Sequence, residues 1–191
     1  MGRWEPGARQ RLVLAAVDLF TEQGYDATTV AQIAERAGVT KSTFFRHFPD
    51  KRELLVAGQE SMCRLLSEGI AEAPGGASPM VAVATALERV ATMMGPDNRE
   101  LGPRIKAAVA ASTELQERDA LKTVSLAAAM TTALLARGVP EMTAHLAGEL
   151  GVLAFKQGYA RWSESDQNGR DLAEYALSAL DELRTASRSL D

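Results

Sequence analysis

Hydroxyl and cationic side chains follow Gly38 in a stretch that contains no acidic residue before Pro49. The members of this set are Thr40, Lys41, Ser42, Thr43, Arg46 and His47. Groups of these types bind phosphate oxygens and the polar edges of nucleic-acid bases. A carboxylate among them would repel phosphates, so the acid-free stretch predicts a surface suited to nucleic acid.

Two short helices are predicted to hold these side chains in place. Thr28 or Thr29 is a candidate N-cap for the first of them, and its inward positions are apolar. Gly38 predicts a sharp corner, and Thr40 is the expected N-cap of a helix with Phe44 in the core. Phe48 is expected in the same core. This spacing is that of a helix-turn-helix, whose second helix presents a polar face to the major groove.

Further helices are predicted on both sides of this pair. An amphipathic stripe precedes it at Leu12, Ala15, Ala16, Leu19 and Phe20, and ends at Gly24. After Pro49, the spacing of Asp50 and Glu53 resembles a capping box and predicts a long fourth helix that ends near Ala73.

The remainder of the chain is also predicted to be helical. The segment 74–79 is rich in Pro, Gly and Ser and predicts a linker. Apolar helical patterns follow near 80–94, 103–112, 114–137, 140–163 and 170–187, with breaks at Gly95-Pro96, Gly102-Pro103, Gly138-Val139-Pro140 and Asn168-Gly169. No stretch is typical of a strand, so the predicted fold class is all-α.

Composition narrows the function classes. The 191 residues carry a net charge of -4, which argues against a protein that coats nucleic acid or membranes without specificity. Residues 1–53 hold eight Lys/Arg against seven Asp/Glu, so the excess acid lies in the remainder. Cys63 is the only cysteine, which excludes an intrachain disulfide and favours a reducing cytoplasm. No apolar run is judged long enough to span a bilayer, so a cytoplasmic location is predicted.

The N-terminal residues resemble those of the TetR family of bacterial transcriptional regulators. The resemblance is closest over 9–57, and includes 15–20, 24–30 and the run 39–55. It implies residues 1–55 as a helix-turn-helix DNA-binding domain and residues 56–191 as a helical effector-binding and dimerisation domain. It also implies a homodimer that binds a palindromic operator and is released as a repressor when a small molecule binds.

The resemblance assigns DNA contacts to Thr29, Thr40, Lys41, Ser42, Thr43, Phe45, Arg46, His47 and Lys51. Phe45 stands where the family usually has a tyrosine, which removes one hydroxyl contact. Simpler interpretations remain: Phe45 as a core ring, His47 as a surface histidine, and Arg46 as a solvated charge. Arg3, Arg9 and Arg11 form either a basic arm for a neighbouring groove or a solvated terminus.

The last two predicted helices, 140–163 and 170–187, are the expected dimerisation helices. The first has small residues at helical spacing: Ala144, Ala147, Gly148, Gly151, Ala154 and Gly158. The second has an apolar stripe: Leu172, Ala173, Ala176, Leu177, Leu180 and Leu183. Packing within one chain is the alternative interpretation of both stripes.

An apolar or amphipathic effector is expected among the C-terminal helices. Candidate pocket residues are Leu87, Val90, Met94, Ile105, Val109, Met130, Phe155, Tyr159 and Trp162. The C-terminal half also loosely resembles mycofactocin-associated TetR regulators that respond to acyl-CoA, in which Arg99, Arg104 or Lys106 would meet the phosphates of the coenzyme.

Two other function classes were weighed. An all-helical enzyme lacks support, because the sequence has no phosphate-binding Gly-rich loop and too few Cys and His for a closed Cys/His metal site. No cofactor is therefore expected. The other class is a helix-turn-helix DNA-binding or adaptor protein without small-molecule control.

Overall fold

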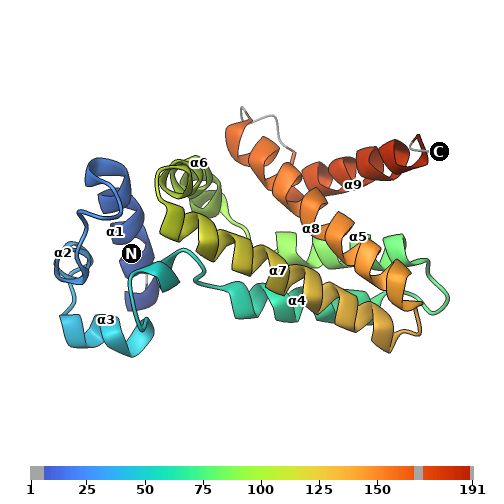
Figure 1. Cartoon of the computed structure of the whole chain (residues 1–191), viewed down its shortest axis with the longest axis horizontal. Helices are drawn as coiled ribbons and strands as arrows, with labels where there is room; N and C mark the ends of the chain where they lie inside the picture. Colours follow the sequence, from blue (N-terminus) through green and yellow to red (C-terminus); the bar gives the residue numbers. More distant parts are fainter. Residues whose placement is uncertain (1–6, 166–169, 190–191) are drawn as a thin grey trace, which may run out of the picture. The chain divides into compact units, whose positions relative to one another are not determined.

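The computed structural model describes residues 7–165 and 170–189, and these form nine α-helices and one short 3-10 helix with no strand (Figure 1). The predicted all-α class is confirmed. Arg3 and the predicted break at Asn168-Gly169 lie outside the described residues.

The helices form two compact units. Residues 1–57 and 103–120 make up the N-terminal unit, and residues 58–102 and 121–191 make up the C-terminal unit. The sequence places 103–120 with the C-terminal half, whereas the structure packs this segment with the helix-turn-helix. The functional division into 1–55 and 56–191 stays a prediction.

Three α-helices, one short 3-10 helix and parts of two further α-helices form the N-terminal unit. They are α1 (Ala8–Gln23), α2 (Val30–Arg36), α3 (Lys41–His47), the 3-10 helix η1 (Arg52–Leu54), and parts of α6 (Pro96–Ala110) and α7 (Thr113–Ala136). The α1 stripe, Phe44 and Phe48 are buried together, as predicted. Ala108 and Leu115 join the same core, which is why 103–120 belongs to this unit.

The predicted long fourth helix is wrong in its first turns. The chain forms only η1 after Asp50, then turns through Gly58, which has φ +91°, before α4 (Gln59–Glu72) begins. A residue with a side chain rarely adopts this φ, so the glycine ends the first segment. The Asp50 carboxylate accepts hydrogen bonds from the backbone N–H groups of Arg52 (2.8 Å) and Glu53 (3.3 Å). Glu53 does not complete a capping box.

The predicted break at Gly102-Pro103 is also wrong, because α6 runs through both residues. The structure gives another reason for the glycine. A Cβ at Gly102 would lie 2.7 Å from Ser163 Cβ, so Gly102 allows α6 to approach α8 (Glu141–Glu164) closely. A close helix contact, and not a helix end, accounts for this residue.

The segment 74–79 joins two helices that pack on each other, and it is therefore no linker between domains. It connects α4 to α5 (Pro79–Ala91), and both helices belong to the C-terminal unit. Ser78 caps α5 by accepting a hydrogen bond from the N–H of Val81.

Arg137 binds the C-terminal end of α4. Its guanidinium donates to four carbonyl oxygens at 2.8 to 3.3 Å: those of Ile70, Ala71, Ala73 and Pro74.

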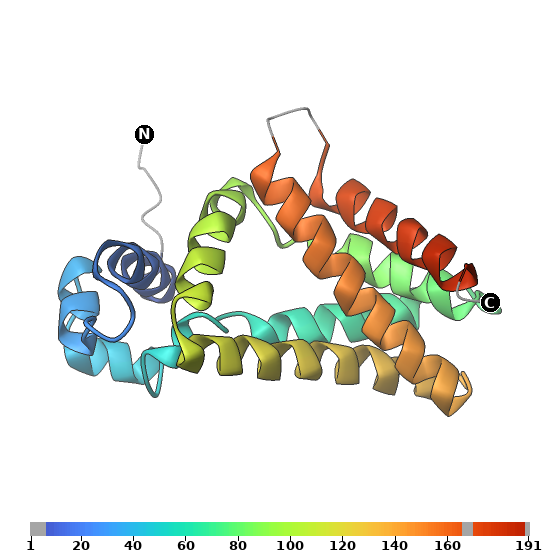
Figure 2. The ribbon, with the colours of Figure 1, turned by 45° about the horizontal axis from the view of Figure 1, so that its top comes forward.

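The small residues of α8 pack within the chain. Figure 2 shows α8 beside α9 (Leu172–Arg188), and Gly158 lies against the backbone of Ala176 in α9. Gly151 lies against Met130, and Gly148 against Thr131. The buried α9 residues Leu172, Ala176 and Leu180 belong to the core of the same chain. These residues therefore fit the alternative interpretation of packing within one chain, and the assignment of α8 and α9 to a dimer contact stays a prediction.

Gly158→Ala is expected to lower the free energy of unfolding by about 1–3 kcal/mol, because an added Cβ must displace packed neighbours. That Cβ would lie 2.5 Å from Ala176 Cα and 2.6 Å from its nitrogen. Urea denaturation followed by circular dichroism measures the change. Gly75→Ala is the matched control, since a Cβ there meets nothing within 4 Å. Unchanged stability of Gly158→Ala with weaker self-association would contradict the intrachain contact.

The length and hydropathy of α7 differ from the sequence-based expectation. Among the described residues, it is long and apolar enough to span a membrane by length and composition alone, with an 18-residue window of mean hydropathy 1.2. The expectation that no run has this character is wrong for α7. Only 28% of that window is buried, so α7 carries an exposed apolar surface.

Candidate nucleic-acid interface

Thr29 begins α2 with a complete capping box. Its hydroxyl oxygen accepts a hydrogen bond from the N–H of Gln32 (3.3 Å), and Gln32 Oε1 accepts one from the N–H of Thr29 (2.9 Å). Of the two candidate caps, the structure selects Thr29. Thr28 is buried, and its hydroxyl donates to the carbonyl of Gly24 at 2.7 Å.

Gly38 makes the corner between α2 and α3. Its φ is +67°, a left-handed conformation that costs a residue with a Cβ about 1–2 kcal/mol. The N–H groups of Gly38 and Val39 donate to carbonyls of the last turn of α2, at 3.0 and 2.9 Å. Arg11 Nε donates to the carbonyl of Ala37 at 3.0 Å and so ties α1 to the corner. Arg11 lies within α1, and the basic-arm interpretation is wrong for it.

The α3 helix begins at the predicted cap. Thr40 Oγ1 accepts a hydrogen bond from the N–H of Thr43 at 3.1 Å. Phe44 and Phe48 are buried below the helix, and the outward positions are exposed. The exposed set at 41, 42, 45 and 46 consists of Lys41, Ser42, Phe45 and Arg46. These four residues, which we call the α3 outer face, share one side of the helix opposite the core.

Phe45 is not part of the core. Its side chain is 56% exposed, which excludes the interpretation of a buried ring. The ring packs edge-on against Phe44, with centroids 5.3 Å apart and planes at 81°. Because Phe44 is fully buried, this contact holds the Phe45 ring in a defined place on the α3 outer face.

Two further basic residues, His47 and Arg9, lie beside the end of α3. His47 is half-buried at the last helical position, and Arg9 of α1 places its guanidinium carbon 5.1 Å from the centre of the Phe48 ring. Arg9 therefore lies in a helix, so the basic-arm interpretation is wrong for it as well. A DNA contact by His47 or Arg46 stays a prediction.

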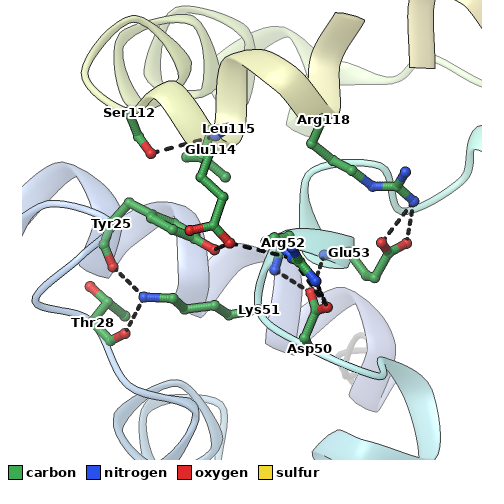
Figure 3. Close-up of polar contacts among 10 residues, drawn as sticks. All are labelled: Tyr25, Thr28, Asp50, Lys51, Arg52, Glu53, Ser112, Glu114, Leu115 and Arg118. Atoms are coloured by element: carbon green, nitrogen blue, oxygen red, sulfur yellow. Dashed lines mark hydrogen bonds and ion pairs between the residues drawn. The ribbon is translucent and has the colours of Figure 1, made fainter. Parts of the chain in front are cut away.

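Lys51 contacts the turn that precedes α2. Its ammonium donates to the carbonyls of Tyr25 (2.7 Å) and Thr28 (3.0 Å) and lies 3.9 Å from the centre of the Tyr25 ring (Figure 3). The resemblance to the TetR family implies a phosphate contact for Lys51. The structure shows that it also fixes the backbone leading into Thr29, and its phosphate contact stays a prediction.

A polar network joins this turn to the start of α7 within the N-terminal unit (Figure 3). The Tyr25 hydroxyl donates to Glu114 at 2.9 Å, and Arg52 Nε lies 3.3 Å from the same carboxylate. Burial, followed by this hydrogen bond, raises the pKa of Tyr25, so the hydroxyl keeps its proton. Arg118 pairs with Glu53 at 2.7 Å.

This network has no local signal in the sequence. Tyr25 and Glu114 are separated by 89 residues, and no local spacing links them. Nearer in sequence, the side-chain hydrogen bond from Arg52 lowers the pKa of Asp50. The network keeps the residues around the helix-turn-helix in contact with 103–120, and Arg104 of that segment also pairs with Asp18.

Comparison with known proteins identifies the N-terminal part. The family model described as bacterial regulatory proteins of the tetR family matches residues 12–57, which carry α1, the corner at Gly38 and α3. Residues 12–57 are therefore similar to the N-terminal part of TetR-family regulators. The match covers the helix-turn-helix that the sequence predicts.

Sequence similarity to known transcriptional regulators extends beyond residues 12–57. The chain is 37% identical over 93 residues to the transcriptional regulator TcmR of Streptomyces glaucescens, an alignment that covers 44% of this chain and 41% of TcmR. The chain thus spans less than half the length of this relative. TcmR is named as a transcriptional regulator and not as an enzyme.

Solved structures show the fold of the whole chain. The Thermus thermophilus TetR-family repressor FadR, solved with lauroyl-CoA, is 24% identical with a TM-score of 0.54, and the match covers 91% of each chain. A TetR-family regulator from Syntrophomonas wolfei is 19% identical with a TM-score of 0.62, covering 94% of each chain. Both share the all-helical TetR architecture.

The candidate effector residues are distributed over both units. Ile105 and Val109 belong to the N-terminal unit, and Val109 packs on its core. The other seven belong to the C-terminal unit. Of these, Leu87, Val90, Met130 and Trp162 are buried, while Met94, Phe155 and Tyr159 are half-buried. The buried members fill the core.

Aromatic residues of α8 gather beside the first turn of α6. Tyr159 stacks on Phe155 (centroids 6.0 Å apart), lies 5.7 Å from the Trp162 ring, and donates its hydroxyl to the carbonyl of Asn98 at 2.6 Å. Burial raises the pKa of Tyr159 to about 12, so the hydroxyl remains a donor. Arg99 faces the Trp162 ring at 5.9 Å and donates to the Ser165 side chain at 2.9 Å. We call Phe155, Tyr159 and Trp162 the aromatic row.

A shallow groove of about 680 Å³ lies elsewhere in the C-terminal unit, between α5 and α9. Its lining includes Met80, Ala84 and Leu177 together with charged residues such as Glu88 and Arg184. None of the nine candidate effector residues lines this groove. In the described part of the chain, no group of three or more His, Cys, Asp or Glu side chains is placed to hold a metal ion.

Proposed function

We propose that this chain is a DNA-binding transcriptional regulator whose α3 reads a palindromic operator in the major groove. The observation that supports this most directly is the α3 outer face, exposed, free of acids, and fixed by the Thr40 cap and the Gly38 corner. Helix-turn-helix proteins of this kind use the second helix to contact base edges.

A gel-shift assay on DNA selected from random duplexes tests the proposal. The full-length protein is expected to enrich a palindrome and to hold it against excess competitor DNA. Sequence-blind binding that disappears as salt is raised would instead support a non-specific DNA-binding protein.

We propose further that the regulator is a homodimer and that a second copy covers an apolar surface on α7 and α8. Residues of this surface, which we call the α7–α8 face, are Leu121, Val124, Leu135, Met142, Leu146 and Leu153, all exposed. The two helices adjoin, because Gly148 lies against Thr131 and Lys156 donates to Thr123 at 3.3 Å. Large exposed apolar patches mark interaction surfaces, and a palindrome requires a two-fold symmetric protein.

We propose an amphipathic effector, with acyl-CoA as the first class to test, that releases the protein from DNA. The aromatic row with Arg99 at its side offers apolar rings next to a cation, as an amphipathic ligand requires. The FadR structure with lauroyl-CoA supports the same class. Arg99 and Arg104 already have partners within the chain, so either would exchange a contact on binding.

Operator release measured with lauroyl-CoA, free coenzyme A and lauric acid separately tests this effector class. Release by lauroyl-CoA alone is the expected result. If none of the three changes either operator binding or the melting temperature, the chain fits the alternative of a helix-turn-helix protein without small-molecule control.

Phe45→Tyr is expected to tighten operator binding by about 1 kcal/mol, because it adds a hydroxyl that can donate to a phosphate. The exposed ring leaves room for this group. Fluorescence anisotropy with a labelled operator measures the change. The control is Met93→Tyr at an exposed position of the C-terminal unit, which should leave operator affinity unchanged. An unaltered affinity for Phe45→Tyr would show that no phosphate lies within reach of the ring.

A further inference from the structure

We infer that Phe45 reads sequence by packing its ring against the C5-methyl group of a thymine in the major groove. The inference rests on the proposed operator binding and adds a specific recognised group to it. Phe45 occupies the α3 outer face with Lys41, Ser42 and Arg46, so any base-reading role of that face includes Phe45.

The chemistry of the ring selects its partner. Phenylalanine has no donor or acceptor, so Phe45 cannot bind a phosphate or the polar edge of a base. The thymine methyl is the apolar group that a base presents in the major groove, and aromatic or small apolar side chains contact it. An aromatic ring that is 56% exposed on an otherwise polar face is accounted for if the ring becomes covered on binding.

The ring is also held in place before binding. Its edge-on contact with Phe44, at 5.3 Å between centroids, restrains it, and Phe44 is anchored in the core. The polar neighbours on either side, Lys41 and Arg46, are suited to phosphates or to guanine. A restrained apolar group between cations loses little conformational entropy when it meets a methyl group.

Deoxyuridine scanning tests the assignment, because deoxyuridine pairs as thymine does but lacks the methyl. Each thymine of the selected operator is replaced in turn, and the affinity of the full-length protein is measured. One position per half-site is expected to weaken binding by about fourfold, which corresponds to ~0.8 kcal/mol for one buried methyl group. Replacing both symmetric positions should weaken it by about 16-fold.

A double-mutant cycle attributes the effect to Phe45. Phe45→Ala should bind more weakly and should no longer distinguish thymine from deoxyuridine at that position. Phe45→Tyr keeps the ring and should retain the discrimination. Lys41→Ala is the matched control: it should lower affinity while leaving the deoxyuridine penalty at about fourfold.

Two outcomes would overturn the inference. In one, specific operator binding is intact but no deoxyuridine substitution weakens it, which rejects the Phe45 assignment and leaves the proposed function standing. In the other, the penalty persists undiminished in Phe45→Ala, which assigns the methyl contact to another residue. If the protein selects no operator at all, the proposed function itself is rejected, and the inference about Phe45 is rejected with it.

Discussion

Replacing Lys41 and Thr43 together by alanine should reduce operator affinity by about 100-fold or more and leave the fold intact. Each direct contact to a base or phosphate contributes about 1–3 kcal/mol, and both residues lie in the first turn of α3. Non-specific binding should change little: the loss of one lysine lowers the slope of affinity against salt concentration by the equivalent of about one phosphate contact. Specific binding should change much more, because the preference for operator over scrambled DNA should disappear.

The fold should survive because the hydrogen bond from the backbone to the Thr40 cap is kept, and only the exposed contact between the Thr40 and Thr43 hydroxyls (3.1 Å) is lost. Thr40 Oγ1 accepts from the backbone N–H of Thr43, and both groups remain in the double variant. Anisotropy titrations on operator and scrambled DNA measure the loss, and thermal unfolding checks the fold. Thr185→Ala with Arg188→Ala, on exposed positions of α9, is the matched control and should bind DNA as the unmodified protein does. A full-affinity Lys41/Thr43 variant would exclude α3 as the reading helix.

Leu146→Asp should convert the protein to a monomer and reduce palindrome binding by more than about 100-fold. Leu146 is 59% exposed at the centre of the α8 part of the α7–α8 face, so the single chain has no need of it for packing. A second copy would bury the new carboxylate without a partner, which costs several kcal/mol. Sedimentation velocity measures the association state, and gel shifts on full and half operators measure the DNA binding.

Val81→Asp is the matched control for this variant. Val81 is 48% exposed in the same unit, but it lines the groove between α5 and α9 and lies outside the α7–α8 face. It should remain dimeric. The reverse pattern, with Val81→Asp monomeric and Leu146→Asp dimeric, would move the proposed interface to the α5–α9 groove.

The N-terminal elements were predictable because their signals are local. The Thr29 and Thr40 caps depend on hydrogen bonds that span three residues. Gly38 depends on its own φ. The burial of Phe44 follows from the helical period. Such features are encoded within a few residues and need no knowledge of distant segments.

The sequence is ambiguous where one pattern permits two structures. Small residues at helical spacing allow a close approach, but the spacing is the same whether the neighbour is Ala176 of the same chain or a second copy. The same ambiguity affects Gly102, where a glycine before proline indicates a helix end but here provides room for Ser163. Which neighbour a glycine meets is decided by the packing of whole helices.

By itself, the sequence of this protein determined the all-helical class, the helix-turn-helix and the chemistry of its reading helix, because periodicity, caps and turn residues act over short distances. Only the tertiary structure placed 103–120 with the helix-turn-helix, through Glu114 beside Tyr25 and Arg118 beside Glu53. It also turned Lys51 toward the carbonyls of Tyr25 and Thr28, and left the apolar side chains of α7 and α8 exposed. These contacts join residues far apart in the chain, and their formation depends on how complete helices pack together.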